Sequence, residues 1–148
     1  MTDRSTAEQA EHLSYRRARM LPFLALIYLL QQASYFSQNE GERLVDHVKI
    51  SAWVILSLVL LAALATKGFW FHSREVRDLI DDETTRSHRR DAMVWGFIFT
   101  TLTAIVLYMV AMFEAVSGRE AIHLIISLGL AAALIRFGYL ERQAHRGA

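Results

Sequence analysis

The stretch AMVWGFIFTTLTAIVLYMVAMF, residues Ala92–Phe113, decides the fold, because its 22 residues include no charged side chain. As a helix it would be about 33 Å long at 1.5 Å per residue, enough to cross a hydrocarbon core of about 30 Å. A backbone within lipid must satisfy its own hydrogen bonds, so only helices and closed barrels cross it. The stretch therefore predicts a membrane-spanning helix.

Three further runs resemble this one in being apolar and free of Asp, Glu, Lys and Arg. Each approaches the length that a spanning helix needs. Together with the first stretch they predict an all-α membrane protein, a bundle of four transmembrane helices. The runs are Met20–Phe36, Ile50–Thr66 and Ala121–Ile135, the last continuing through Arg136 to Leu140.

Composition agrees with this interpretation and limits the chemistry. Hydrophobic residues make up 53% of the 148-residue chain, as expected where the interior and the lipid-facing surface are both apolar. The chain has no cysteine, so disulfide bonds, thiolate metal sites and thiol catalysis are excluded.

Basic residues are distributed unevenly over the connections between the runs. Of the 16 Lys and Arg residues, 13 lie in the N-terminal segment, the middle connection and the C-terminal tail. The other two connections hold only Arg43, Lys49 and Arg119. Because cytoplasmic loops are enriched in Lys and Arg, we expect both termini and the middle connection to lie in the cytoplasm.

The four runs divide into two helical hairpins within a single membrane domain. We expect a cytoplasmic N-terminal segment at 1–17, a first hairpin at 18–71, a cytoplasmic helical loop at 72–91, a second hairpin at 92–140 and a cytoplasmic tail at 141–148.

Short motifs recur in the two hairpins. The pattern S-x-R-R-x-x-M occurs at Ser14–Met20 and again at Ser87–Met93, and the run Ser57–Leu64 resembles Ser127–Leu134. Either the hairpins arose by duplication, or Leu and Ala coincide by chance in apolar helices. Duplication would relate the two copies by a pseudo-two-fold axis along the membrane normal.

Polar and special residues within the runs predict how the helices pack. Pro22 is expected in the first turn of its helix, where a missing N–H costs little, and Gly129 and Ala133 allow close helix approach. Uncharged polar side chains are expected to hydrogen-bond between helices; they are Gln31, Gln32, Ser57, Thr100, Thr101, Thr103 and Ser127.

The cytoplasmic loop contains a candidate binding surface. From His72 to Trp95 there is neither Gly nor Pro, and Val76, Leu79 and Ile80 recur at helical spacing. The surrounding charges either solvate the turn and orient the protein, or dock a soluble partner. On the second interpretation the partner-binding residues are Arg77, Asp78, Asp81, Asp82, Glu83, Arg86, Arg89 and Arg90.

The run Leu79–Glu83, with Arg86, Arg89-Arg90 and the entry Trp95–Phe97, resembles small four-span bacterial inner-membrane proteins encoded beside helix-turn-helix regulators of the XRE type. This resemblance implies a multi-pass inner-membrane protein that sequesters or inhibits a cytoplasmic transcription factor. The acidic residues would then cover a DNA-binding surface, which is necessarily basic. We expect the protein itself not to contact nucleic acid. Whether it forms a homo-oligomer is left open by the sequence.

A small transporter or ligand-sensing bundle is the first alternative. It would place a neutral ligand among Tyr28, Gln31, Gln32 and Tyr108. No run contains a carboxylate or lysine near its middle, which argues against proton-coupled transport.

A haem-carrying redox subunit is the second alternative. Either His47 and His123 or His72 and His88 would ligate the iron. Both His47 and His123 lie at the predicted outer boundary, where a histidine is more often a solvated structural residue. We therefore expect no cofactor, no metal ion and no enzyme activity.

Overall fold

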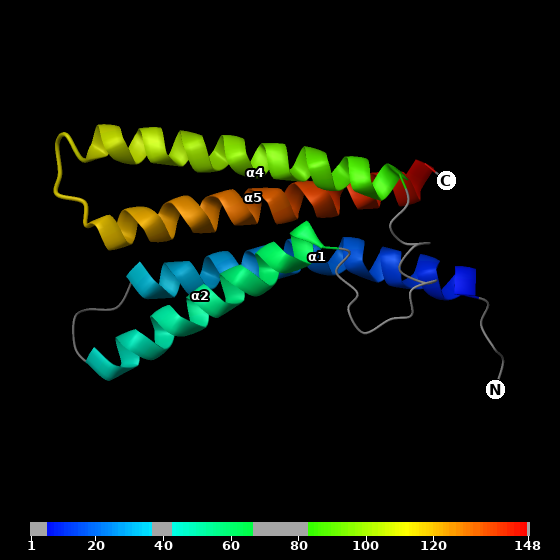
Figure 1. The fold of residues 1–148 in the computed structure, drawn as a ribbon, viewed down its shortest axis with the longest axis horizontal. Helices are drawn as coiled ribbons and strands as arrows, with labels where there is room; N and C mark the ends of the chain where they lie inside the picture. Colours follow the sequence, from blue (N-terminus) through cyan, green and yellow to red (C-terminus); the bar gives the residue numbers. More distant parts are fainter. Residues whose placement is uncertain (1–5, 37–42, 67–82, 148) are drawn as a thin grey trace.

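The computed structural model describes residues 6–36, 43–66 and 83–147, and side chains within 12–33, 48–66 and 83–144. The regular secondary structure of the described residues is all α-helical, as the sequence predicts (Figure 1). The helices are α1 (Thr6–Phe36), α2 (Arg43–Ala65), α4 (Glu83–Val110) and α5 (Gly118–Gly147).

Three of these helices are long and apolar enough to cross a membrane. Their apolar segments are Val48–Ala65, Glu83–Val110 and Gly118–Ala144. Helix α1 is not among the three, since Gln31 and Gln32 interrupt its apolar stretch. A membrane protein with spanning helices is therefore supported.

Helix α5 is the central element. It packs along both α4 and α1 and touches α2 over a shorter length, while α2 is inclined to the other three helices (Figure 1). Half of the apolar segment of α5 is buried, against 17% for α2 and 6% for α4. The core lies around Tyr28, Leu134 and Phe137, all nearly inaccessible.

Helices α4 and α5 approach to backbone contact. A Cβ atom added to Gly129 would lie 1.9 Å from Thr100 Oγ1, and one added to Gly96 would lie 2.9 Å from Ala133 Cβ. The predicted packing role of Gly129 and Ala133 is confirmed. The small residues let carbonyl and methyl groups make contacts that larger side chains would prevent.

The prediction for Pro22 is wrong. Helix α1 begins at Thr6, because no helix breaker precedes Pro22 in the charged segment, so Pro22 lies inside the helix. Proline has no N–H, and the carbonyl of Ala18 therefore loses its usual intrahelical donor. Arg142 of α5 donates to this oxygen from Nε, at 3.1 Å.

The ring of Pro22 also requires space on α5. A Cβ on Gly138 would lie 2.7 Å from Pro22 Cδ, so only glycine fits opposite the ring. Arg142 donates a second bond from Nη2 to the carbonyl of Arg19, at 3.1 Å. Helix α5 thus supplies both the room and the donors that a proline inside α1 needs.

Candidate functional site

The start of α1, the start of α4 and the end of α5 lie at one end of the bundle. Direct contacts join them, including Arg17 with Glu141 and Arg136 with Asp91. We call this the arginine-rich end; its described arginines are Arg16, Arg17, Arg19, Arg86, Arg89, Arg90, Arg136 and Arg142.

A buried carboxylate organises the arginine-rich end. Glu141 of α5 is only 3% exposed and forms an ion pair with Arg17 of α1. Helix α4 contributes His88, whose Nδ1 lies 3.1 Å from Glu141 Oε1, and Thr85, whose hydroxyl donates to the same oxygen at 3.3 Å. We call these four residues the Glu141 cluster. Three helices are tied together through one side chain.

The surroundings of the cluster explain why the charges are tolerated there. A buried carboxylate is costly unless it is paired and hydrogen-bonded, and Glu141 receives partners at both oxygens. The Arg17 guanidinium carbon also lies 5.1 Å from the centre of the Phe137 ring. Its charge is therefore balanced by a carboxylate and an aromatic face.

A second contact between α4 and α5 reinforces this end. Arg136 Nε donates to Asp91 Oδ2 at 2.7 Å, and its guanidinium carbon lies 5.3 Å from the Trp95 ring centre. Both partners are partly exposed, so this ion pair is weaker than the one at Glu141.

Of the predicted partner-binding residues that the structure describes, none belongs to the Glu141 cluster. Arg77, Asp78, Asp81 and Asp82 lie outside the described residues. Glu83, Arg86 and Arg90 are exposed in the first turns of α4, whereas Arg89 is half-buried and lines a cavity. The described members thus lie at the arginine-rich end.

Sequence reasoning missed Glu141. A signal did exist, because Glu141 is the first carboxylate after the fourth apolar run, and Arg17 and His88 stand near the entries to two other runs. Sequence spacing shows how far these residues lie from the ends of the apolar runs. It does not show which face of a helix contacts which neighbouring helix.

Nearer the middle of the bundle lies a second polar group, the Tyr28 network. Tyr28 OH and Ser57 Oγ are 2.6 Å apart, and Ser127 donates to Tyr28 OH at 3.5 Å. Trp53 Nε1 donates to Ser127 Oγ at 3.3 Å. These bonds connect α1, α2 and α5.

The interhelical bonding predicted for polar residues is correct for some of them. Ser57, Ser127 and Gln32 bond across helices. Thr100 and Thr101 instead donate to carbonyls of their own helix, those of Gly96 and Phe97, both at 2.9 Å. A threonine hydroxyl in a helix reaches the carbonyl four residues earlier without any neighbour.

His123 is not the solvated residue that its boundary position predicts. It is 3% exposed, its Nδ1 lies 2.9 Å from Gln32 Oε1, and its ring stacks on Trp53 with centroids 3.7 Å apart. His72 and the side chain of His47 are outside the described part. Within that part, no three His, Cys, Asp or Glu side chains are arranged to hold a metal ion.

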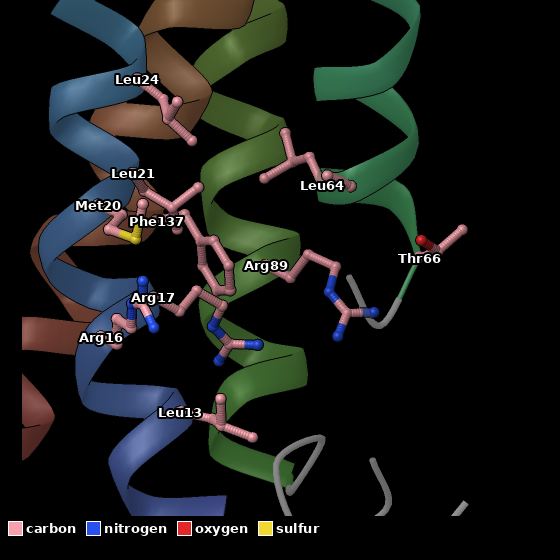
Figure 2. A pocket seen from close by; sticks show the side chains of 11 residues that line it. Leu13, Arg16, Arg17, Met20, Leu21, Leu24, Leu64, Thr66, Arg89 and Phe137 are labelled. Atoms are coloured by element: carbon pink, nitrogen blue, oxygen red, sulfur yellow. The ribbon is translucent and has the colours of Figure 1, made fainter. Parts of the chain in front are cut away.

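A cavity of about 350 Å³ opens at the arginine-rich end. Leu21 and Leu24 of α1, Leu64 of α2 and Phe137 of α5 form its apolar walls. Figure 2 shows the Phe137 ring next to Arg17, and Arg89 reaching from α4 toward the end of α2 near Thr66. Arg16 also lines it.

No protein-family model, no curated protein and no solved structure matches this chain. Function therefore has to be inferred from the chemistry of the sites themselves.

Proposed function

We propose that this protein is a non-enzymatic regulator that crosses a bacterial inner membrane four times and holds a soluble cytoplasmic partner at the membrane. In this arrangement α1 crosses the membrane in addition to α2, α4 and α5. The four helices form two tandem hairpins, and both termini lie in the cytoplasm. The asymmetric distribution of Lys and Arg supports this orientation.

The observation that carries the proposal is the set of contacts that joins three helices at the arginine-rich end. Helices α1, α4 and α5 have 31, 28 and 30 residues, whereas about 20 cross the hydrocarbon core. The additional residues precede Met20 in α1, precede Ala92 in α4 and follow Leu140 in α5. The Glu141 cluster ties these extensions together, and a preorganised surface loses less conformational entropy on binding.

The exposed charges define what such a partner would look like. Glu83, Arg86 and Arg90 are exposed on α4, and Asp81 and Asp82 directly precede them in the chain. A surface with adjacent acidic and basic groups fits a partner of complementary pattern. On the resemblance of this segment, that partner is a helix-turn-helix regulator whose basic surface meets the acidic residues.

Topology is tested first. A reporter that is active only in the cytoplasm should be active when it is fused after Ala148. A tag inserted between Thr84 and Thr85 should also be located in the cytoplasm. An external position for either one contradicts the proposal.

Recruitment is tested with the helix-turn-helix regulator encoded nearest to this protein, carried as a fluorescent fusion. We expect the fusion in the membrane fraction when the full chain is present, and in the soluble fraction with the triple variant Asp81→Lys, Asp82→Lys, Glu83→Lys. Arg119→Glu, a charge reversal in the first turn of α5 at the opposite end of the bundle, serves as the matched control and should keep the fusion bound. A fusion that stays soluble with the unaltered chain, or that ignores the triple variant, argues against the proposal.

A further inference from the structure

We infer that a groove on the exposed side of α1 binds one anionic phospholipid, whose phosphate is held by Arg19 of α1 and Arg142 of α5. The groove has a volume of about 830 Å³, which is within the range of ligand sites in proteins. Tyr15 lines it together with the two arginines. The other lining residues are apolar and belong to α1: Met20, Phe23, Leu24 and Ile27. We call this the Arg142 groove.

Two backbone carbonyls fix the guanidinium of Arg142. Its Nε donates to the carbonyl of Ala18 and its Nη2 to the carbonyl of Arg19, both at 3.1 Å. The carbonyl of Ala18 can accept this bond because Pro22 has no N–H to donate to it. A guanidinium has five N–H donors, so three remain on Nη1 and Nη2. These three can bind phosphate oxygens, which match the planar geometry of arginine.

The second cation of the groove is Arg19. It is exposed, and its guanidinium carbon lies 5.7 Å from the centre of the Tyr15 ring. An aromatic ring attracts a cation but carries no net charge, so this contact leaves the positive charge of Arg19 unbalanced. Among the residues whose side chains the structure describes, no carboxylate forms an ion pair with Arg19 or Arg142. Two positive charges therefore favour an anionic ligand.

The position of the two arginines along their helices suits a lipid headgroup. Arg19 directly precedes Met20, the first residue of one apolar run. Arg142 follows Leu140, the end of another, by two positions. Basic pockets between membrane helices on the cytoplasmic side bind anionic headgroups at this boundary. This step rests on one part of the proposed function, that α1 crosses the membrane with its N-terminal end in the cytoplasm, and not on the recruitment of a partner.

The apolar part of the groove favours a lipid over a soluble anion. Met20, Phe23 and Ile27 are 47%, 66% and 55% exposed and recur at helical spacing. They form a stripe about 10 Å long that begins beside Arg19 and continues into the apolar run. A phospholipid whose phosphate is bound can place an acyl chain on this stripe, whereas a free phosphate gains nothing from it.

The test uses the purified full chain and native mass spectrometry of lipid-bound species. Phosphatidylglycerol and phosphatidylcholine with identical acyl chains are added in competition, with inorganic phosphate as a third arm. We expect one phosphatidylglycerol molecule to be retained in preference to phosphatidylcholine, and phosphate not to displace it. Equal retention of the two lipids, or displacement by phosphate, would overturn the inference.

Arg19 is the residue to change, because its side chain contacts the Tyr15 ring of its own helix and can be replaced without breaking a bond between helices. Arg19→Gln should bind phosphatidylglycerol about fivefold more weakly, as expected on removing one charge near an anionic headgroup. Arg19→Lys keeps the charge and should restore most of the binding. An unchanged preference in Arg19→Gln would overturn the inference.

Arg16→Gln is the matched control. Arg16 is an exposed arginine of α1, three positions from Arg19, and does not line the Arg142 groove. Its removal should leave the preference intact, and equal losses in Arg16→Gln and Arg19→Gln would show only a general attraction of anionic lipids to this end, against the inference. Because the purified chain is measured without a partner, lipid retention combined with failed recruitment leaves this inference standing, and the reverse result overturns it alone.

Discussion

Helices α2 and α5 contain similar sequences but pack differently. In the runs Ser57–Leu64 and Ser127–Leu134, some matched positions have similar burial: Ser57 and Ser127 are 8% and 1% exposed, and Leu60 and Leu130 are 5% and 8%. The matched alanines differ, since Ala63 is exposed and Ala133 is buried. Where the two runs have different residues, the exposure of the side chains also differs.

Those differing positions explain why α5 is central. Val59 and Leu61 of α2 are 56% and 49% exposed. Their counterparts in α5 are Gly129, whose Cα faces Thr100 and Gly96 of α4, and Ala131, which is 2% exposed. Large side chains on a second face keep a helix at the periphery of the bundle, whereas small ones let a neighbour approach that face as well.

The largest effect is expected where one side chain joins the two halves of the chain. Glu141→Ala leaves the mostly buried Arg17 without its carboxylate partner, and breaking a buried ion pair costs about 3–5 kcal/mol. Unfolding of the purified chain in mixed micelles with a denaturing detergent, followed by circular dichroism, measures this loss. Arg17→Ala, Glu141→Ala should be less destabilised than the sum of the single variants. Strict additivity would show that the two residues do not interact.

The next effect tests the close approach of α4 and α5 directly. Gly129→Val gives α5 the residue that α2 has at this position, and the added atoms would overlap Thr100 and the carbonyl of Gly96. Overpacking of this kind costs about 1–3 kcal/mol. The reciprocal change Val59→Ala should cost much less, because Val59 is half exposed. Similar losses in the two variants would mean that α2 and α5 do not differ in the way described.

The element pattern was predictable from the sequence because uncharged runs define helices within lipid, whatever their neighbours are. The same runs do not show which helix face meets which neighbour. Pro22 illustrates this limit: its tolerance inside α1 depends on Gly138 and Arg142, more than 110 residues away in the chain. The local sequence favours a proline at the start of a helix. A proline inside a helix is tolerated only when a packed neighbour compensates for it.

The candidate site was predictable to a similar degree. Arg86, Arg89 and Arg90 were expected in the loop between the hairpins as partner-binding residues; they lie at the arginine-rich end, and their binding role stays a prediction. Glu141 was not identified and His123 was expected to be solvated, because their surroundings depend on other helices. Arg17 and His88 contact Glu141, and Gln32 and Trp53 contact His123.

A smaller effect is expected where α2 is attached to the rest of the bundle. Tyr28→Phe removes the hydroxyl that lies 2.6 Å from Ser57 Oγ, and interhelical bonds of this kind contribute about 1 kcal/mol. The same unfolding measurement should show this loss, with Tyr108→Phe, a 72% exposed residue, as the control. Fluorescence of Trp53 should also change, because its ring belongs to the same network. If the two tyrosine variants unfold alike, hydrogen bonding does not hold α2 in place.

The smallest effect is expected at the partly exposed ion pair between α4 and α5. Arg136→Gln removes the bond to Asp91 and the contact with Trp95, and an exposed pair of this kind contributes less than about 1 kcal/mol. Its contribution should fall as salt is added, since mobile ions screen exposed charges, whereas the loss in Glu141→Ala should change little. A salt-independent loss in Arg136→Gln would place this pair in the same class as the buried one. The packing of α4 against α5 would then depend on this ion pair as well as on the small residues between the two helices.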